Sequence, residues 1–549
     1  MKTNCNSGRL QLAVLILVLS LAGCSRAPQG PPQTLGGVVK DAAGKPVAGA
    51  FVRVEAAAAA QSITQTVLVI SQADGAYRTP TLRPGSYIVQ SFGGEWQSAA
   101  AAPVAVSAEK SGEYDVTLNQ PRPPSVPETR VTQADYESVM PEGEGKQLIV
   151  SHCIHCHVLD RIVPTRHTPA QWTTTVDRMS WFIDERSDLW KSHGFKPLTS
   201  RERTVVRDYL GKNFGMDAPP FAAGQPKVAD PTWHLPRIPQ SGATAKYFAV
   251  EFDLGASSYE TGLDAHGDLW ITEGNGNFGI LDGLIFEYTR LSAPAGVKPR
   301  VLAQIAEAPD GNIWMLDNGP TPHAELLRYT PATKEFKTFP ISAPAKFRAP
   351  LNTLRFLDGN LWGTGNSSSR VVKMDMATGA ITDFSVPKGS HPYGIAIGGE
   401  GTVWYTGNYN NAVGKVDPGT GKITTYKLAD HGVGLRRMAA DAEGNLWVGA
   451  QDSNQLIRVD YRTGDMAKFD VPTANAGPYA VDVDKKNTLV WFTERDADRI
   501  GRFNPKTGEF AEFALPSKDL EPRRVFVDPV NPRRVWWSGV RIGYLEVTD

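Results

Sequence analysis

The densest group of reactive side chains in the chain is the heptapeptide SHCIHCH, residues 151–157, with two cysteines and three histidines. Its C-x-x-C-H pattern places Cys153 and Cys156 one helical turn apart, so both thiols can reach the two vinyl groups on one edge of a porphyrin. His157 then lies beneath the iron as its proximal ligand. The spacing predicts one covalently attached haem c.

A zinc site and a redox disulfide are the competing interpretations of the two cysteines. A structural zinc ion takes four N or S ligands, usually from a second Cys or His pair, and the only other cysteines, Cys5 and Cys24, lie in the N-terminal segment. A thioredoxin-like C-x-x-C is typical of a βαβ setting, which is absent here. An oxidising compartment still permits a disulfide, but the pattern and the predicted helices around it favour haem.

The sixth ligand of the iron is left open by the sequence. Met179 is the first candidate, because it shares a predicted helix face with Trp172 and a thioether would raise the potential. His193, just before the last predicted helix, is the rival and would give bis-His coordination. The remaining possibilities are His167, His152 and an open site.

Two predicted helices must position this site. The first has an apolar face formed by Trp172, Val176, Met179 and Ile183. The second begins after Thr199 as N-cap and turns inward Val205, Val206, Tyr209 and Leu210. The arginines that could pair with haem propionates are Arg161, Arg166 and Arg178.

This segment, 134–218, resembles class I c-type cytochromes. The run TPAQWTTTVDRM, residues 168–179, is similar to a run that follows the haem motif in the haem domains of quinohaemoprotein amine dehydrogenases. The resemblance implies an all-α cytochrome c domain and electron transfer. It is specific at the C-x-x-C-H motif and weaker elsewhere.

The C-terminal segment, 246–549, holds a repeat marked by tryptophan. The seven copies are DLWITE, NIWMLD, NLWGTG, TVWYTG, NLWVGA, LVWFTE and RVWWSG, at Trp270, Trp314, Trp362, Trp404, Trp447, Trp491 and Trp536. Their intervals of 44, 48, 42, 43, 44 and 45 residues match one four-stranded blade each. The repeat predicts a seven-bladed β-propeller.

Two further signals concern the hairpins and the closure of the ring. Five of the seven tryptophans have a glycine three residues earlier, as a tight hairpin requires, whereas the last two copies carry DKKNTL and DPVNPR. The segment KYFAVEFDL, residues 246–254, looks like the outer strand of a blade although it precedes the first tryptophan. We therefore expect it to complete the last blade and remove two sheet edges.

The repeats resemble the virginiamycin B lyases, also called streptogramin lyases. The phrases P-x-G-I, DGN-L-W-x-T-E and K-[VI]-D-P-x-T-G-x-I-T-x-[YF] carry the resemblance, and residues 391–428 are the best copy. In that family a magnesium-dependent pair of histidines in the last two blades, with nearby glutamates, forms the active centre. Here those two positions are Tyr479 and Arg523, and only Glu521 keeps the glutamate, so the resemblance implies the fold more than the lyase activity.

In each blade the start of the first strand (the strand start) and the end of the second strand (the return) should meet at one face of the ring, which we call the mouth. The strand starts bring Tyr259, Glu260, Tyr393, Arg436, Tyr479, Glu521 and Arg523. The returns bring Glu273, Asp317 and Glu494. The sequence predicts a polar ligand site there, and the catalytic candidates are Glu521, Arg523, Tyr479, Glu494 and Glu273.

The N-terminal residues predict export. Lys2 and Arg9 precede an apolar run, residues 10–21, that ends in Leu21-Ala22-Gly23-Cys24. This end resembles the bacterial lipobox, in which the cysteine becomes the acylated first residue. The sequence thus predicts a signal peptide over 1–23, a tether over 24–34 and a periplasmic lipoprotein, outer-membrane rather than inner, held to the membrane by lipid alone.

The remaining segments are a small β domain and two linkers. Residues 35–120 alternate short β-rich runs with Gly and Pro turns and resemble the carboxypeptidase regulatory-like domain, a β-sandwich; exposed Trp96 is a weak candidate for sugar binding. Pro-rich segments 121–133 and 219–245 are predicted linkers. With 57 basic and 58 acidic side chains and no basic run, nucleic acid is not an expected partner.

The sequence thus predicts a mainly β protein: a seven-bladed propeller, a small β-sandwich and an all-α cytochrome c domain. The leading hypothesis is a lipid-anchored electron-transfer protein whose partner is a redox protein or a quinone-linked chain, and whose propeller takes that partner or a small-molecule substrate. In one version the chain is an oxidoreductase. The alternatives are a magnesium-dependent C–O lyase acting on a cyclic depsipeptide and a non-catalytic binding or sensor protein.

Overall fold

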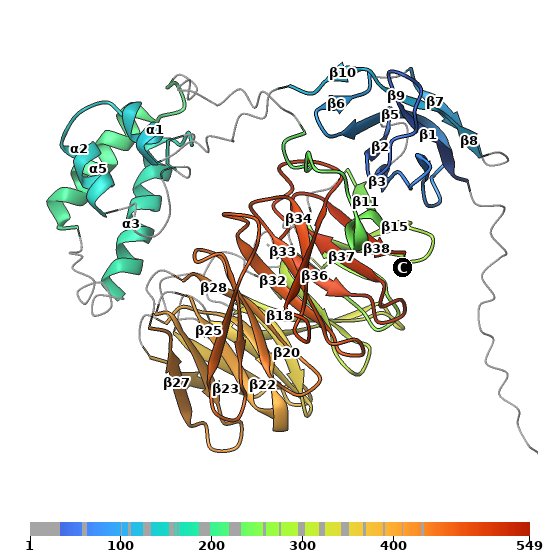
Figure 1. The fold of residues 1–549 in the computed structure, drawn as a ribbon. Helices are drawn as coiled ribbons and strands as arrows, with labels where there is room; N and C mark the ends of the chain where they lie inside the picture. Colours follow the sequence, from blue (N-terminus) through green and yellow to red (C-terminus); the bar gives the residue numbers. More distant parts are fainter. Residues whose placement is uncertain are drawn as a thin grey trace, which may run out of the picture.

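The chain is mainly β, with one helical segment, in a computed structural model (Figure 1). The structure describes residues 33–57, 63–99, 102–107, 111–123, 133–152, 159, 162–163, 165–185, 198–218, 232–255, 258, 260–273, 276–294, 302–317, 324–341, 351–365, 369–387, 390–408, 410–429 and 433–548. Among these residues, no helix is both long and apolar enough to cross a membrane.

The N-terminal domain is a β-sandwich, as predicted. Its strands are β1 (Leu35–Asp41), β2 (Phe51–Ala56), β3 (Thr64–Ile70), β4 (Ala76–Arg78), β5 (Gly85–Gly93), β6 (Trp96–Gln97), β7 (Val104–Val106), β8 (Gly112–Glu113), β9 (Val116–Leu118) and β10 (Gln120–Pro121). One sheet has the order β4-β1-β8 with β9 also paired to β1, and the other contains β10-β6-β5-β2-β3 with β7 on β5. Apolar side chains of both sheets, such as Val39, Val52 and Val89, are fully buried between them.

Seven four-stranded blades follow in the described part of the chain, which confirms the predicted propeller. The first three are β12 (Glu260–Leu263), β13 (Leu269–Thr272), β14 (Asn277–Leu281) and β15 (Tyr288–Ser292); β16 (Leu302–Glu307), β17 (Ile313–Asp317), β18 (Ala324–Thr330) and β19 (Glu335–Ile341); and β20 (Leu351–Leu357), β21 (Asn360–Gly365), β22 (Arg370–Asp375) and β23 (Ile381–Ser385). The next three are β24 (Pro392–Ile397), β25 (Val403–Gly407), β26 (Ala412–Val416) and β27 (Ile423–Lys427); β28 (Leu435–Ala440), β29 (Leu446–Ala450), β30 (Gln455–Val459) and β31 (Met466–Asp470); and β32 (Pro478–Asp484), β33 (Leu489–Glu494), β34 (Arg499–Asn504) and β35 (Glu509–Ala514). The last blade consists of β36 (Arg524–Val527), β37 (Arg534–Ser538), β38 (Ile542–Val547) and β11 (Tyr247–Asp253).

The repeated tryptophan lies in the second strand of every blade and is buried at each of its seven positions. The glycine three residues earlier has a positive φ in all five blades that carry it, between 67° and 90°. In blade six Thr488 occupies this position with φ 59°, a strained conformation for a β-branched residue. The tight hairpin is therefore kept in that blade without its usual residue.

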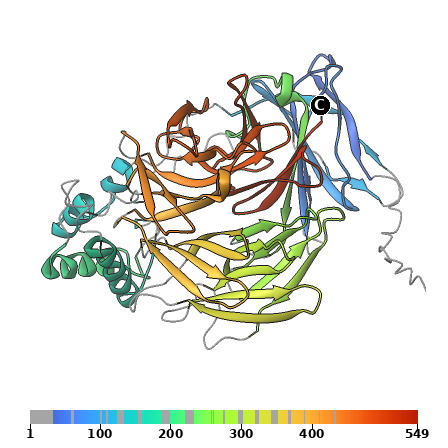
Figure 2. The same cartoon turned by 90° about the horizontal axis from the view of Figure 1, so that it is seen from below.

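The ring closes through the strand that precedes the first blade. Strand β11 pairs antiparallel with β38 from Tyr247↔Val547 to Phe252↔Ile542, which confirms the prediction from KYFAVEFDL. Its other edge pairs with β3 of the sandwich, from Phe248↔Val69 to Asp253↔Thr64, a contact that the sequence did not indicate. One ten-stranded sheet thus runs from the sandwich into the last blade (Figures 1 and 2).

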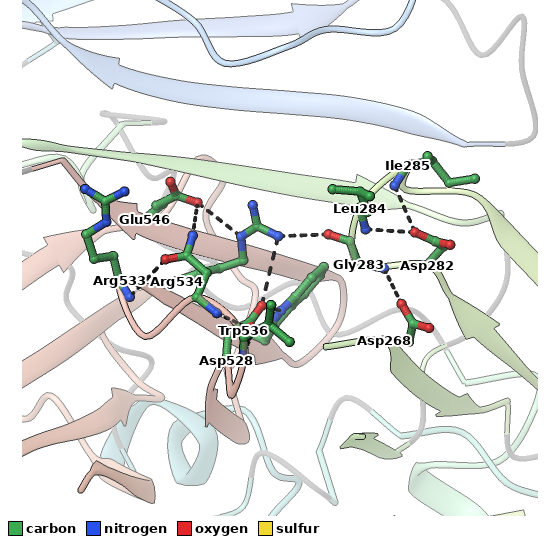
Figure 3. Close-up of polar contacts among 12 residues, drawn as sticks. Asp268, Asp282, Gly283, Leu284, Ile285, Asp528, Arg533, Arg534, Trp536 and Glu546 are labelled. Atoms are coloured by element: carbon green, nitrogen blue, oxygen red, sulfur yellow. Dashed lines mark hydrogen bonds and ion pairs between the residues drawn. The ribbon is translucent and has the colours of Figure 1, made fainter. Parts of the chain in front are cut away.

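Side chains also join the last blade to the first (Figure 3). Arg534 of β37 donates from Nη1 to the carbonyl of Gly283, at 2.8 Å, and from Nε to Glu546, at 3.1 Å. The Gly283 N–H in turn donates to Asp268, at 2.8 Å. These bonds cross from blade seven to the β14–β15 turn and tie the two ends of the ring together.

The helical segment contains α1 (Gln133–Ser138), α2 (Glu144–His152), α3 (Pro169–Glu185) and α5 (Ser200–Asn213) among its described residues. Thr199 caps α5 and forms a capping box with Glu202, as predicted for an N-cap. Trp172 and Val176 of α3 are buried in a core shared with Val206 and Leu210 of α5. The side chains of Met179 and Ile183 lie outside the described residues.

Parts of the two predicted linkers are packed between the sandwich and the propeller. Arg122 is buried and donates from Nη2 to the carbonyls of Thr232, at 2.9 Å, and Leu235, at 3.1 Å. Gly242–Ala245 forms a short 3-10 helix, η2, before β11. The chain therefore enters and leaves the helical segment at neighbouring points.

Candidate functional site

The first strand of five consecutive described blades, two to six, carries a β-bulge near its start. The pairing shifts at Ala303/Ile305, Leu351/Leu354, Pro392/Ile395, Leu435/Met438 and Pro478/Val481. A bulge interrupts the alternation of side chains and re-aims the extra residue. Tyr393, Arg436, Arg437 and Tyr479 all lie within these bulges, which explains how one strand type supplies polar groups to the centre of the ring.

The best-defined group in the mouth is a tyrosine pair. The hydroxyls of Tyr393 and Tyr479 are hydrogen-bonded to each other. The guanidinium carbon of Arg436 lies 5.7 Å and 5.5 Å from the centroids of the two rings, and that of Arg437 lies 5.5 Å and 6.0 Å from them. Two cations thus face two phenols whose hydroxyls share one hydrogen bond.

The two phenols differ in acidity. Burial raises the pKa of Tyr393, but Arg437, the hydrogen bond from Tyr479 and Arg436 outweigh it and hold the pKa below its usual value. Burial, followed by the charge of Tyr393, raises the pKa of Tyr479. Tyr393 is therefore the more acidic phenol of the pair.

Glu521 lies between two arginines. It accepts a hydrogen bond from Arg495 Nη2 at 2.7 Å, and it also pairs with Arg523. Burial raises the pKa of Glu521, but the bonds from Arg523 and Arg495 outweigh it, so the pKa is lowered. This carboxylate is ionised and held in place at neutral pH, and its acceptor capacity is already engaged.

Glu260 is the buried counter-ion of the ring. It accepts from Arg524 Nε at 2.5 Å and from Arg437 Nη2 at 3.1 Å, and these arginines come from blades seven and five. Burial raises the pKa of Glu260, but Arg524 and Arg437 outweigh it and lower the pKa below its usual value. Glu260 thereby links three blades across the centre of the ring.

Glu273 and Glu494 lie at the strand ends, beside the strand starts of their own blades, and their side chains meet the outer strand of the same blade. Their role in a ligand site stays a prediction. Glu273 accepts a hydrogen bond from Tyr288 Oη at 2.8 Å and pairs with Arg290, both on the outermost strand of its own blade. The reason is the glycine between them, Gly279, because any β-carbon there would lie 2.5 Å from the Tyr288 ring. The missing side chain lets the outer strand reach across to the glutamate.

Glu494 has the equivalent place in blade six, where the outer strand supplies Glu512; there the glycine of the third strand, Gly501, accommodates the ring of Phe492. Both carboxylate oxygens of Glu494 are buried without a hydrogen-bond partner. Burial, and then the charge of Glu512, raises the pKa of Glu494 well above its usual value. The raised pKa favours the protonated form of Glu494 in the folded state.

This difference predicts opposite effects of one substitution at equivalent positions. The folded state holds a proton on Glu494 that the unfolded chain releases above about pH 4.3, so stability is lost as the pH rises above that value. Glu494→Gln should remove this loss and raise the unfolding temperature at about pH 8, with little change near pH 4.5. Glu273→Gln, which loses the ion pair with Arg290, should lower the unfolding temperature at pH 8. An equal effect of both variants in thermal unfolding would contradict the assignment.

The other predicted mouth residues fall into two groups. Tyr259 lies outside the described residues, and Asp317 is buried at the end of β17, opposite Leu302 and Glu325. Sequence reasoning missed Arg437 and Arg524, the second members of the tandem pairs Arg436-Arg437 and Arg523-Arg524. The tandem itself was the available signal, since the second arginine of each pair is the one that reaches Glu260.

The predicted haem ligands are largely outside the described residues. These are Cys153, Cys156, His157 and His193, and the predicted lipidation site Cys24 is outside them as well. The backbone of Met179 lies in α3. Of the alternative ligands, the ring of His167 packs edge-on against Trp172 at 4.8 Å, and His152 Nδ1 lies 3.1 Å from the Leu148 carbonyl.

The proposed propionate partners are only partly described. Arg161 and the side chain of Arg178 lie outside the described residues. Arg166 donates to the Val163 carbonyl at 2.7 Å and lies over the Phe214 ring at 5.6 Å. Among the described residues, no group of three or more His, Cys, Asp or Glu side chains could hold a metal ion.

Comparison with known proteins identifies two parts of the chain. Residues 294–549 match the virginiamycin B lyase family, and residues 34–119 match the carboxypeptidase regulatory-like domain. No curated protein matched the chain.

Solved structures agree on the propeller. A streptogramin B lyase structure is 25% identical, with a TM-score of 0.51, and covers 56% of this chain and all of its own. A virginiamycin B lyase from Staphylococcus aureus, solved as a catalytically inactive variant with quinupristin, is 24% identical with a TM-score of 0.47, over 53% of this chain and 95% of its own. The C-terminal part of the chain is thus a virginiamycin B lyase-like β-propeller, joined to a carboxypeptidase regulatory-like domain.

Proposed function

We propose that the chain is an exported, lipid-anchored c-type haem protein that transfers electrons, and that its propeller binds the redox partner or substrate. The observation that carries the proposal is the sequence Cys153-Ile154-His155-Cys156-His157, which begins one residue after the end of helix α2. In the leading form the partner is a redox protein or a quinone-linked chain, and in the stronger form a small-molecule substrate gives its electrons to the haem.

The packing of the helices supports a compact domain around this motif. Helices α2 and α5 cross where Gly145 faces Tyr209, and a β-carbon on Gly145 would lie 2.3 Å from that of Tyr209. Glycine is required for such a close approach. Trp172 of α3 donates from Nε1 to the carbonyl of Phe214 at 2.8 Å. Phe214 is the C-cap residue of α5, so α3 is fixed to the C-terminal end of α5.

The donor set fits haem c in its chemistry. Cys153 and Cys156 would hold the porphyrin through thioethers, His157 would be the proximal ligand, and Met179 or His193 would be the sixth. When bound, the group accepts and releases one electron at a time. Arg166, the described member of the three arginines proposed to pair with the propionates, is held by two carbonyls and lies over the Phe214 ring.

The mouth supports the binding role of the propeller. Arg436, the Tyr393–Tyr479 pair and the Arg495–Glu521–Arg523 group present cations and hydroxyls together on one face. Such a set suits a polar ligand with negative charge, either a small molecule or an acidic patch of a partner protein. The predicted periplasmic location, with acylation of Cys24 and outer-membrane anchoring, would place this face outside the cytoplasm.

The proposal is tested on the full chain, produced with a functional haem-attachment machinery. The reduced-minus-oxidised visible spectrum should show c-type bands. Turnover with an artificial electron acceptor over a panel of small alcohols, amines and phenolics then separates an oxidoreductase from a relay or sensor. A protein without c-type bands that contains zinc instead would overturn the proposal.

The two candidate sixth ligands give different spectra. If Met179 binds the iron, Met179→Ala should remove the sulfur-to-iron charge-transfer band and lower the midpoint potential, because a thioether favours the ferrous state. His193→Ala should leave both unchanged. If His193 is the ligand, the parent should lack that band, and His193→Ala, unlike Met179→Ala, should change the visible spectrum and the midpoint potential. An unchanged spectrum and potential in both variants would contradict both assignments.

The lyase is the second candidate, and the family match over residues 294–549 favours it. Its difficulty is chemical, since Tyr479 and Arg523 replace the family's histidines and Glu521 is engaged by two arginines. Linearisation of a cyclic depsipeptide by the full chain, dependent on magnesium and lost in Glu521→Gln, would establish it. Absence of linearisation, with c-type bands present, favours the haem protein.

A further inference from the structure

The centre of the propeller holds a channel of about 290 Å³, lined by residues of six blades. One water molecule needs roughly 10–15 Å³ of such volume, so the channel has room for a small ligand and its hydration. Three guanidinium groups line it, those of Arg355, Arg437 and Arg524, from blades three, five and seven. The channel lies below the tyrosine pair of the mouth, and Arg437 belongs to both.

Two of these arginines are fixed by partners. Arg437 donates to Glu260 and, from Nη1, to Thr353 Oγ1 at 2.9 Å. Arg524 donates to Glu260 and, from Nη2, to Gln304 Oε1 at 2.6 Å. The Nε of Arg437 is buried without a hydrogen-bond partner, so even this network leaves one donor unsatisfied.

Arg355 has no carboxylate partner among the residues that the structure describes. Its Nη1 donates to the carbonyl of Leu354 at 2.8 Å. The carboxylates that also line the channel are engaged by the backbone: Asp482 accepts from the N–H groups of Val483, at 2.9 Å, and Val527, at 2.8 Å, and Glu307 accepts from that of Ala265, at 2.7 Å. Burial lowers the pKa of Arg355, and the charge of Asp482, which is not within ion-pair distance, offsets this only in part.

The backbone of β16, which lines another side of the channel, is strained. Gln304 has a φ of 39°, in the left-handed region, within the bulge of β16. This conformation holds its buried carboxamide against Arg524. Backbone strain of this kind is retained where the surrounding structure imposes it, and it is concentrated at ligand-binding sites.

We propose that the channel binds one small oxyanion, a carboxylate or a phosphate, through Arg355 with Arg437 and Arg524 beside it. The planar guanidinium fork matches the geometry of both anions. The anion would supply the direct ion-pair partner that Arg355 lacks among the described residues, and it would join blades three, five and seven. This site shares Arg437 with the mouth and does not depend on haem.

Thermal unfolding and calorimetric titration of the full chain test the site, with phosphate, succinate and chloride compared at constant ionic strength. Phosphate or succinate should raise the unfolding temperature with a saturable dependence, as expected for binding to the folded state, and chloride should not. Arg355→Gln should weaken binding by about tenfold or more, the effect of losing a charge-assisted hydrogen bond. Arg533→Gln, an exposed arginine of the same chain, should bind as the parent does.

Arg355→Lys keeps the positive charge but lacks the planar guanidinium fork, so it is the variant to measure if Arg355→Gln does not fold. Its affinity for the anion should still fall severalfold. Absence of saturable stabilisation in the parent would overturn the proposal, as would unchanged affinity in the folded Arg355 variants. Binding lost in Arg523→Gln but kept in Arg355→Gln would place the anion in the mouth and equally overturn it.

Discussion

Replacing Cys153 and Cys156 together by alanine should abolish covalent haem in the full chain. The two thiols are the only attachment points that the sequence offers for the vinyl groups, because Cys5 lies in the predicted signal peptide and Cys24 is the predicted acylation site. Without thioethers the porphyrin is held by axial ligation alone and is extracted by acidified organic solvent. The measurement is the haem absorbance that remains with the denatured polypeptide, which should fall from one equivalent to none.

The matched control is Cys24→Ser, which removes only the predicted acylation site. This variant should retain one equivalent of covalent haem and lose its association with the membrane fraction. Covalent haem in the double alanine variant would contradict the attachment site. If the exported Cys24→Ser variant lost its haem, haem attachment at residues 153–157 would depend on Cys24.

Glu260→Leu should lower the free energy of unfolding of the propeller by about 3–5 kcal/mol, the cost of leaving buried charges without their partner. Glu260 is the only carboxylate within ion-pair distance of Arg437 and Arg524 among the described residues, and all three side chains are largely buried. Its removal leaves two guanidinium groups facing each other across the channel, and each already disfavours the charge of the other.

Denaturant unfolding followed by tryptophan fluorescence measures this effect, since every blade carries a buried tryptophan. The control is Glu443→Gln, which removes an exposed partner of Arg458 at 3.6 Å and should cost less than about 1 kcal/mol. Equal losses in the two variants would contradict the role of Glu260 as the counter-ion of the ring.

The propeller was predictable because its signals are local and repeated. Each blade needs an apolar second strand and a tight hairpin, and these requirements produced the tryptophan and the glycine at fixed spacing. Closure by residues 246–254 was predictable for the same reason, since the strand resembles the outer strand of a blade. The continuation of the last blade into β3 was not, because the partner strands are far apart in the sequence and share no local pattern.

The mouth was predictable in part. The strand starts placed Tyr393, Tyr479 and Arg436 together, because a bulge at the same point of successive blades directs them alike. The contact of Glu273 with the outer strand was not predictable, because it depends on the cross-strand Gly279, and the spacing along one strand carries no information about that glycine. Arg355 was missed because a single arginine in a β-strand is most often solvated, and only the closed ring shows that it faces a channel.

Covalent attachment of haem at residues 153–157 can be measured directly on one peptide. Trypsin cleaves after Lys146 and Arg161, so the motif is released in one peptide, residues 147–161. Mass spectrometry of that peptide, from full chain matured with a functional haem-attachment machinery, should show the mass of one haem carried on both cysteines. The same peptide with two free thiols, or with a disulfide between Cys153 and Cys156, would contradict the account.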